Sequence, residues 1–87
     1  MYRVSIAEPA LKALARLPRD GEARIRAAID ALAAQPRPHG CKALRGRGSE
    51  LWRVRVGVYR VVYEIRDDML CIVVVRIGHR REVYRGL

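Results

Sequence analysis

The spacing of apolar residues changes along the chain and predicts an opening strand followed by a helix. Between Tyr2 and Ile6 apolar and polar residues alternate, which is typical of a half-buried strand. Glu8 and Pro9 then open a helix, because proline suits the first turn and an acidic side chain favours the positive end of the helix dipole. Three leucines of this helix are expected to share one buried face: Leu11, Leu14 and Leu17.

A second helix is expected to start near Asp20, which is a favourable N-cap residue. It ends before Pro36 and Pro38, because proline disfavours a helical conformation in the residue that precedes it. The two helices should form a hairpin with one apolar side. The apolar positions of the second helix follow the i, i+3, i+4, i+7 pattern: Ile25, Ala28, Ile29 and Leu32.

The second half of the chain is expected to form a sheet. Residues 36–49 contain three glycines and are predicted to be a loop. Strands are predicted over 51–56, 58–65 and 69–77, with turns at Gly57 and at residues 67–68. The last strand is apolar on both faces and should be central. The predicted order is β-α-α-β-β-β, an α+β fold in which a helical hairpin packs on one face of a mainly antiparallel four-stranded sheet.

Length and composition predict one domain over residues 1–87, with 51% apolar residues to form its core. The start of the chain lacks the apolar stretch of a signal peptide, and the longest apolar run, residues 69–75, is too short to span a bilayer. We therefore expect a cytoplasmic protein without a membrane partner. Cys41 and Cys71 lack zinc-site spacing and are expected to be reduced thiols.

Net charge is +9, from 18 basic and 9 acidic residues. Residues 37–87 carry 12 basic and 5 acidic side chains, whereas residues 1–36 carry 6 and 4. An excess of positive charge in one half of a chain indicates a surface that binds a polyanion. The alternative is a basic surface that only keeps the protein soluble.

Strand alternation concentrates arginines on one face of the predicted sheet. If Trp52 points toward the helices, Arg53 and Arg55 point away from them, about 7 Å apart, which is close to the phosphate spacing of extended RNA. A tight turn at Gly57 would bring Arg60 to the same face. Solvated arginines are the alternative, but like charges on neighbouring strands repel, which favours a binding site for an anion.

The segment 76–85 holds the second concentration of functional residues. Gly78 breaks the strand, so the chain can turn back across the sheet. His79 is a candidate for proton transfer near neutral pH, and Tyr84 among arginines suits stacking on a base. The alternative is a basic tail whose Tyr84 packs on the domain edge. Carboxylates near this face show no ligand spacing, so neither a metal site nor another cofactor is expected.

Five short segments of the chain stand out together: residues 8–14, 42–46, 51–55, 57–63 and 78–84, with the sequences EPALKAL, KALRG, LWRVR, GVYRVVY and GHRREVY. In this order and spacing they resemble the RelE/ParE toxin superfamily nearly end to end. The pattern is closer to the RNase branch (RelE) than to the gyrase-poisoning branch (ParE).

The resemblance implies a toxin of a type II toxin–antitoxin system that cleaves ribosome-bound mRNA without a metal ion. In that reaction a ribose 2′-hydroxyl attacks the adjacent phosphate. Its partner would be an antitoxin from the neighbouring gene. By position, Arg60 and Arg80 would stabilise the transition state and Tyr84 would orient the nucleotide. The basic residues that would contact RNA are Arg53, Arg55, Lys42, Arg45 and Arg81.

The basic pair of the hairpin strand departs from RelE, which has lysines there. Arg53 and Arg55 cannot readily accept a proton, because arginine has a pKa above about 12. Another residue must then be the base, and His79 is the first candidate and Lys42 the second. Two other functions stay open on this fold: a ParE-like gyrase inhibitor, and a non-catalytic module that binds RNA or an antitoxin.

Overall fold

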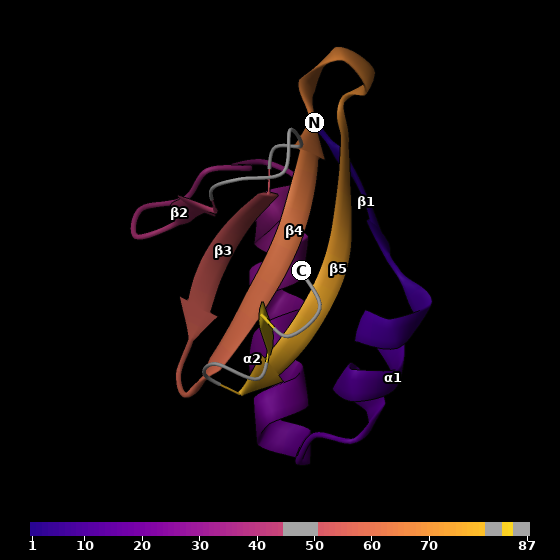
Figure 1. Ribbon diagram of the computed structural model, residues 1–87, viewed down its shortest axis with the longest axis vertical. Helices are drawn as coiled ribbons and strands as arrows, with labels where there is room; N and C mark the ends of the chain where they lie inside the picture. Colours follow the sequence, from indigo (N-terminus) through magenta and orange to yellow (C-terminus); the bar gives the residue numbers. More distant parts are fainter. Residues whose placement is uncertain (45–50, 80–82, 85–87) are drawn as a thin grey trace.

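The computed structural model describes residues 1–44, 51–79 and 83–84. Two helices lie behind one face of a sheet, and α2 runs across the back of it (Figure 1). Helix α1 ends three residues before Pro18, and α2 starts one residue earlier than predicted. The elements in chain order are β1 (Arg3–Ile6), α1 (Glu8–Ala15), α2 (Arg19–Leu32), β2 (Lys42–Leu44), β3 (Leu51–Val56), β4 (Tyr59–Arg66), a 3-10 turn (Asp67–Met69) and β5 (Cys71–His79).

The sheet has five strands in the order β1-β5-β4-β3-β2, so the prediction of four strands was wrong. The additional strand is β2, which lies at the edge and pairs antiparallel with β3. Three residues are too few to show an alternating pattern, so the sequence predicted a loop for this segment. The sheet is mixed, because β1 pairs in parallel with β5 while the other pairs are antiparallel. The predicted central position of β5 is confirmed, since it lies between β1 and β4.

The hydrophobic core lies between the helices and one face of β4 and β5. The stripe predicted for α2 is confirmed at Ile25, Ile29 and Leu32, which are buried. The prediction for α1 was wrong at Leu11, which is 45% exposed, because this two-turn helix buries the side that carries Ala10 and Leu14. The sheet residues that belong to this core are Val61, Tyr63, Ile65, Ile72, Val74 and Ile77.

A β-bulge in β5 changes which side chains face the helices. Val62 of β4 pairs with Arg76 and Tyr63 pairs with Val74, so Val75 has no partner of its own in β4. A bulge re-aims the side chains that follow it. Val74 and Ile77, three residues apart, can therefore both belong to the core. The bulge decides the facing of everything that follows it in β5.

Candidate functional site

Arg53, Arg55 and Arg60 lie on the face of the sheet that points away from the helices, and we call the part of the sheet that they occupy the arginine face. Trp52, Val54 and Val56 pack against the core, so Arg53 and Arg55 point the opposite way, as predicted. The register pairs Arg55 directly with Arg60, which confirms that the hairpin joins them on one face. A like-charge pair in this position destabilises the sheet, and a bound anion would relieve it.

Tyr84 lies against Arg60, although 24 residues separate them in the chain. The Nη1 of Arg60 donates to the Tyr84 hydroxyl at 3.4 Å, and the Arg60 Cζ lies 5.7 Å from the centre of the tyrosine ring. That distance is within the range of a cation–π interaction. The predicted meeting of these two residues is therefore present in the structure.

Gly78 of β5 lies beneath Val83. It lies opposite Arg60 in the register, and a Cβ built on it would be 3.5 Å from the Cβ of Val83. Val83 is buried, so it anchors the chain beside its neighbour Tyr84. Val83 therefore lies in van der Waals range of the space above Gly78.

A pocket of about 290 Å³ opens beside Arg53 and Arg55 on the arginine face. Arg53 is its most buried charged residue, at 7% exposure, and within the described residues no hydrogen bond or ion pair joins it to another side chain. Burying an unpaired charge is costly, so such a pocket favours a bound anion. The lining residues are His39, Gly40, Lys42, Arg53, Val54 and Arg55.

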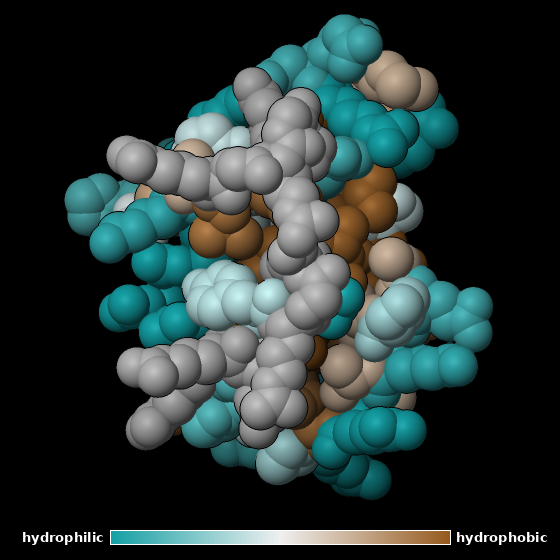
Figure 2. Space-filling model, in the orientation of Figure 1, coloured by the Kyte–Doolittle hydropathy of each residue, from teal (hydrophilic) through white to brown (hydrophobic). Residues whose placement is uncertain are grey.

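Lys42 lines this pocket because β2 pairs with β3 in a register that sets Lys42 opposite Arg53. In the space-filling view, hydrophilic side chains gather along the edge of the face formed by β2 and β3 (Figure 2). A single cationic stripe thus joins the pocket to Arg60 and Tyr84, through Arg55, which contributes to the pocket and pairs with Arg60.

The structure does not bring His79 to this site. His79 pairs with Tyr59, and the two rings meet edge to face with centroids 5.8 Å apart. Tyr59 packs toward α2, where a Cβ on Gly21 would be 3.1 Å from its ring. The bulge at Val75 is the reason, because without it strand alternation would turn His79 to the arginine face.

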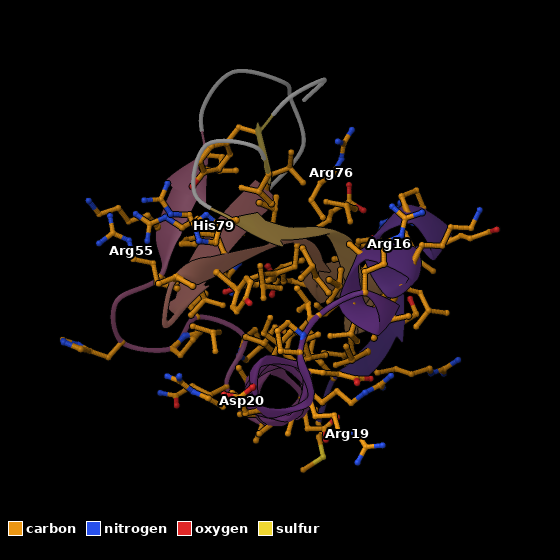
Figure 3. The ribbon with its side chains drawn as sticks, turned by 90° about the horizontal axis from the view of Figure 1, so that it is seen from below. Arg16, Arg19, Asp20, Arg55, Arg76 and His79 are labelled. Atoms are coloured by element: carbon orange, nitrogen blue, oxygen red, sulfur yellow. The ribbon has the colours of Figure 1, made fainter. Side chains whose placement is uncertain are left out.

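Three of the predicted site residues, Arg45, Arg80 and Arg81, lie outside the described residues. Other arginines lie on the surface of the domain far from the arginine face. Figure 3 shows Arg55 on the opposite side of the molecule from Arg16, which follows α1, and from Arg19, which begins α2. Net positive charge alone would not have located the arginine face.

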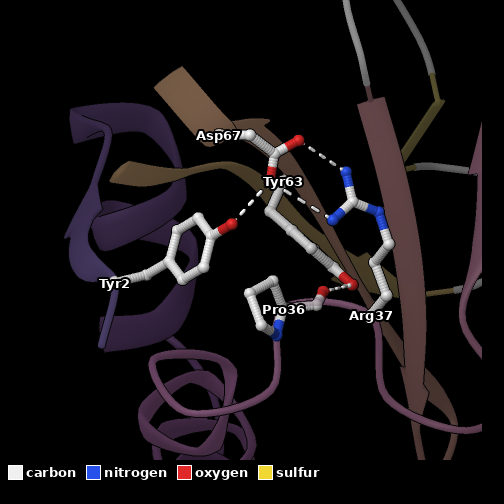
Figure 4. Close-up of polar contacts among 5 residues, drawn as sticks. All are labelled: Tyr2, Pro36, Arg37, Tyr63 and Asp67. Atoms are coloured by element: carbon white, nitrogen blue, oxygen red, sulfur yellow. Dashed lines mark hydrogen bonds and ion pairs between the residues drawn. The ribbon is translucent and has the colours of Figure 1, made fainter. Parts of the chain in front are cut away.

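The loop that carries His39 is fastened to the sheet by two polar contacts (Figure 4). The Tyr63 hydroxyl donates to the Pro36 carbonyl at 2.8 Å, and burial raises the pKa of that hydroxyl above its ordinary value. Arg37 forms a bidentate ion pair with Asp67, with N–O distances of 2.9 and 3.3 Å. These contacts hold the loop beside the pocket.

Asp67 is also an acceptor for the Tyr2 hydroxyl, so it links the loop to the N-terminal strand. The hydrogen bonds from Arg37 and then from Tyr2 lower the pKa of the Asp67 carboxyl. The Arg37 guanidinium also lies 4.9 Å above the Trp52 ring. The anchor therefore combines charge, hydrogen bonding and stacking.

His39 is the site residue that the sequence analysis missed. It lies in a loop, where no hydrophobic periodicity gives a side chain a direction. Its neighbours in the pocket depend on the pairing of β2, which three residues could not reveal. The only available signal was a histidine near prolines and glycine, which alone indicates a turn.

Other kinds of site find no support in the described part of the chain. No three histidine, cysteine or acidic side chains gather there as they would around a metal ion. No helix of residues 1–44, 51–79 and 83–84 is long and apolar enough to cross a membrane.

Comparisons with known proteins agree with this architecture. A family model described as the ParE toxin of the type II toxin–antitoxin system parDE matches residues 4–84. The toxin RelG of Mycobacterium tuberculosis is 33% identical over 85 residues, which cover 97% of both chains. Among solved structures, the archaeal RelE–RelB complex from Pyrococcus horikoshii matches with a TM-score of 0.82 and 32% identity, over 92% of this chain and 96% of the other.

The isolated RelE toxin of Escherichia coli matches with a TM-score of 0.77 and 26% identity, over 97% of this chain and 92% of the other. The family model is named for ParE, whereas the relatives just described are Rel toxins. Both names belong to one superfamily with one fold. The chain therefore belongs to the RelE/ParE superfamily of type II toxin–antitoxin toxins.

Proposed function

We propose that this protein is a RelE-type toxin, a metal-independent endoribonuclease that cleaves ribosome-bound mRNA and is neutralised by a cognate antitoxin. The observation that carries the proposal is the contact between Arg60 and Tyr84, on the same face as Arg53 and Arg55. A phenol beside several guanidinium groups suits a single RNA strand, whose bases stack on aromatic rings and whose phosphates bind cations.

Each part of the cationic stripe has a separate role in this proposal. Arg53, Arg55 and Lys42 hold phosphates on either side of the cleaved bond, and the pocket between them accepts one of these groups. Tyr84 stacks on or orients the nucleotide that is cleaved. Arg60, held against Tyr84, contacts the phosphate that reacts.

In the proposed reaction the ribose 2′-oxygen forms a bond to the adjacent phosphorus, and the bond from phosphorus to the 5′-oxygen breaks. The products are a 2′,3′-cyclic phosphate and a 5′-hydroxyl. Negative charge increases on the phosphoryl oxygens in the transition state, where a fixed guanidinium contributes about 3–4 kcal/mol. Arg60 supplies one such group, and the resemblance assigns a second role of this kind to Arg80.

The antitoxin is the proposed protein partner. The matched family is defined by a toxin–antitoxin system, and the Pyrococcus relative was solved as a RelE–RelB complex. We propose that the cognate antitoxin is encoded in the adjacent gene. Co-expression of that gene product should restore growth in cells that express this chain.

The direct test incubates the purified protein with ribosomes that carry a defined mRNA and maps the products by primer extension. Wild-type protein should cleave and leave a cyclic phosphate. Arg60→Ala should cleave about 10²- to 10³-fold more slowly. Arg16→Ala, which removes an exposed arginine outside the arginine face, should cleave like wild type. The absence of cleavage by wild-type protein, with or without ribosomes, would exclude the nuclease proposal.

Inhibition of gyrase is the second candidate, and the ParE name of the matching family model favours it. A supercoiling assay separates the two, because a gyrase inhibitor would block supercoiling and leave RNA intact. RNA binding that weakens steeply with salt, without any cleaved product, would instead indicate a non-catalytic module.

A further inference from the structure

We propose that His39 accepts the proton of the attacking 2′-hydroxyl, an inference that rests on the proposed RNA cleavage. His39 lines the pocket on the arginine face together with Lys42, Arg53 and Arg55. A phosphate held by those three cations would bring the neighbouring ribose close to the imidazole. The proposed role of His39 as the base therefore rests on its place in the same pocket as the three cations.

His39 is the side chain of the pocket best suited to accept a proton near neutral pH. Arginine stays protonated there and is a donor only. The lining residues Gly40 and Val54 have no titratable group. Imidazole is the side chain whose charge ordinarily changes between pH 5 and 8, whereas lysine is ordinarily a protonated donor in that range. We therefore place His39 ahead of Lys42 for this role.

Candidates outside the pocket are less well placed. His79 meets Tyr59 on the helix side of β5. The Glu64 carboxylate forms an ion pair with Arg66 at 2.7 Å. The Tyr84 hydroxyl lies beside Arg60 and accepts a hydrogen bond from it, and a phenol ordinarily loses its proton only near pH 10.

The loop that carries His39 is anchored close to that residue, whose own side chain is exposed. Two residues earlier, Arg37 is held by Asp67, and three residues earlier the Pro36 carbonyl is held by Tyr63 (Figure 4). An anchored loop keeps the imidazole near the pocket, which lowers the cost of aligning it with a bound ribose. The charged groups that face it are Lys42 from β2 and Arg53 and Arg55 from β3, and the phosphate of a bound RNA would offset their charge.

The step balances without a metal ion or a redox partner. The proton of the 2′-hydroxyl moves to an imidazole nitrogen of His39 as the 2′-oxygen bonds to phosphorus. The bond to the 5′-oxygen breaks, and that oxygen takes a proton from solvent water. The imidazolium then returns its proton to the hydroxide that remains, so the enzyme is unchanged.

The test measures single-turnover cleavage of ribosome-bound mRNA from pH 5 to pH 9 for wild type, His39→Gln and His79→Gln. These are the two histidines of the chain. Wild type should lose activity about tenfold per pH unit below the pKa of its base. His39→Gln should cleave about 10²- to 10⁴-fold more slowly, and its rate should no longer fall at low pH, so that the acid limb of the pH–rate profile is lost. His79→Gln should keep the limb, and added imidazole should partly restore His39→Ala.

Each result decides the proposal. A normal rate and an intact acid limb in His39→Gln would overturn it, and loss of the limb in His79→Gln would return the role to His79. A slow His39 variant that keeps the limb and ignores imidazole would show a structural role only, which also overturns the proposal. If wild-type protein cleaves no RNA, the proposed function itself fails, and this outcome is distinct from the others. Thermal unfolding of each variant confirms that it is folded.

Discussion

The two faces of the sheet are made by the same strands but have different roles, one in stability and the other in binding. On the helix side, Val61, Tyr63 and Ile65 of β4 are buried in an apolar core. On the other side, β3 and β4 set Arg55 directly opposite Arg60. Burial of each large apolar side chain contributes about 1.5–3 kcal/mol to stability, whereas a like-charge pair lowers it. The first face therefore holds the fold together, and the second is built at a cost for binding.

The arginine face also contains buried apolar residues, and these support its charged side chains. Val62 is fully buried on that side, between Arg53 and Arg76 in the register. Val83 is buried over Gly78. A small apolar floor thus supports the guanidinium groups and the phenol. Rigid support of this kind is what a charged site requires to bind without reorganisation.

The largest expected effect comes from damage to the helix side. Ile72 is fully buried in β5, so Ile72→Ala should lower the free energy of unfolding by about 2–5 kcal/mol. A chain of this length has about 4–13 kcal/mol in total. Urea denaturation measures the loss. The cleavage rate per folded molecule should stay at the wild-type value, and a fall in that rate would show that the two faces are not separable.

Removal of the phenol should affect RNA binding rather than stability. Tyr84→Ala should weaken binding of an uncleavable 2′-deoxy oligonucleotide by about 1–3 kcal/mol, because it removes one stacking platform. Tyr84→Phe keeps the ring and should retain most of the affinity while losing the hydrogen bond from Arg60. Fluorescence anisotropy gives both values. Equal affinity for all three proteins would mean that the ring does not contact the nucleotide.

The like-charge pair of Arg55 and Arg60 should lower the stability of the protein while it strengthens RNA binding. Arg55→Ala removes one member, so the protein should become more stable by about 0.2–1 kcal/mol. The same change should reduce the salt dependence of RNA binding, the slope of log K against log salt, by about 0.7 for one lost phosphate contact. Arg16→Ala is the control for both measurements. A destabilised Arg55→Ala protein would show that this arginine has a structural partner.

The smallest expected effect concerns the anchor of the His39 loop. The pKa of Asp67 is lowered in the folded protein, so its contribution to stability is present above the ordinary pKa of an aspartate and is lost as the pH falls through the lowered value. Asp67→Asn should therefore reduce Tm slightly at pH 7, and the difference should disappear in acid. Because the ion pair is exposed, the effect should be small and should shrink in high salt. A difference in Tm that does not shrink as the pH falls would contradict this.

Most of the fold could be predicted because long elements repeat their pattern. The stripe of α2 and the alternation of β3 and β4 extend over enough residues to give each side chain a direction. The edge strand β2 could not be predicted, since three residues carry no period. The exposure of Leu11 could not be predicted either, because only the packing against β5 decides which side of a two-turn helix is covered.

The candidate site was predictable where it lies on regular strands. Arg53 and Arg55 followed from alternation, and Arg60 from alternation with a tight turn at Gly57, and the facing of all three is confirmed. The prediction that Gly78 breaks the last strand was wrong, because β5 continues through Gly78 and pairs His79 with Tyr59. The bulge at Val75 then turns His79 to the helix side, and a bulge leaves no signal in an apolar run. His39 was missed because its place depends on a loop anchor made by distant residues.

The claim that RNA binds the arginine face can be tested most directly by NMR. Isotope-labelled protein would be titrated with an uncleavable 2′-deoxy oligonucleotide while backbone amide shifts are recorded. We expect the largest changes at Arg53, Arg55, Arg60 and Tyr84, and none beyond noise in α1. Changes concentrated in α1 and α2, with the amides of β3 and β4 unmoved, would contradict the account.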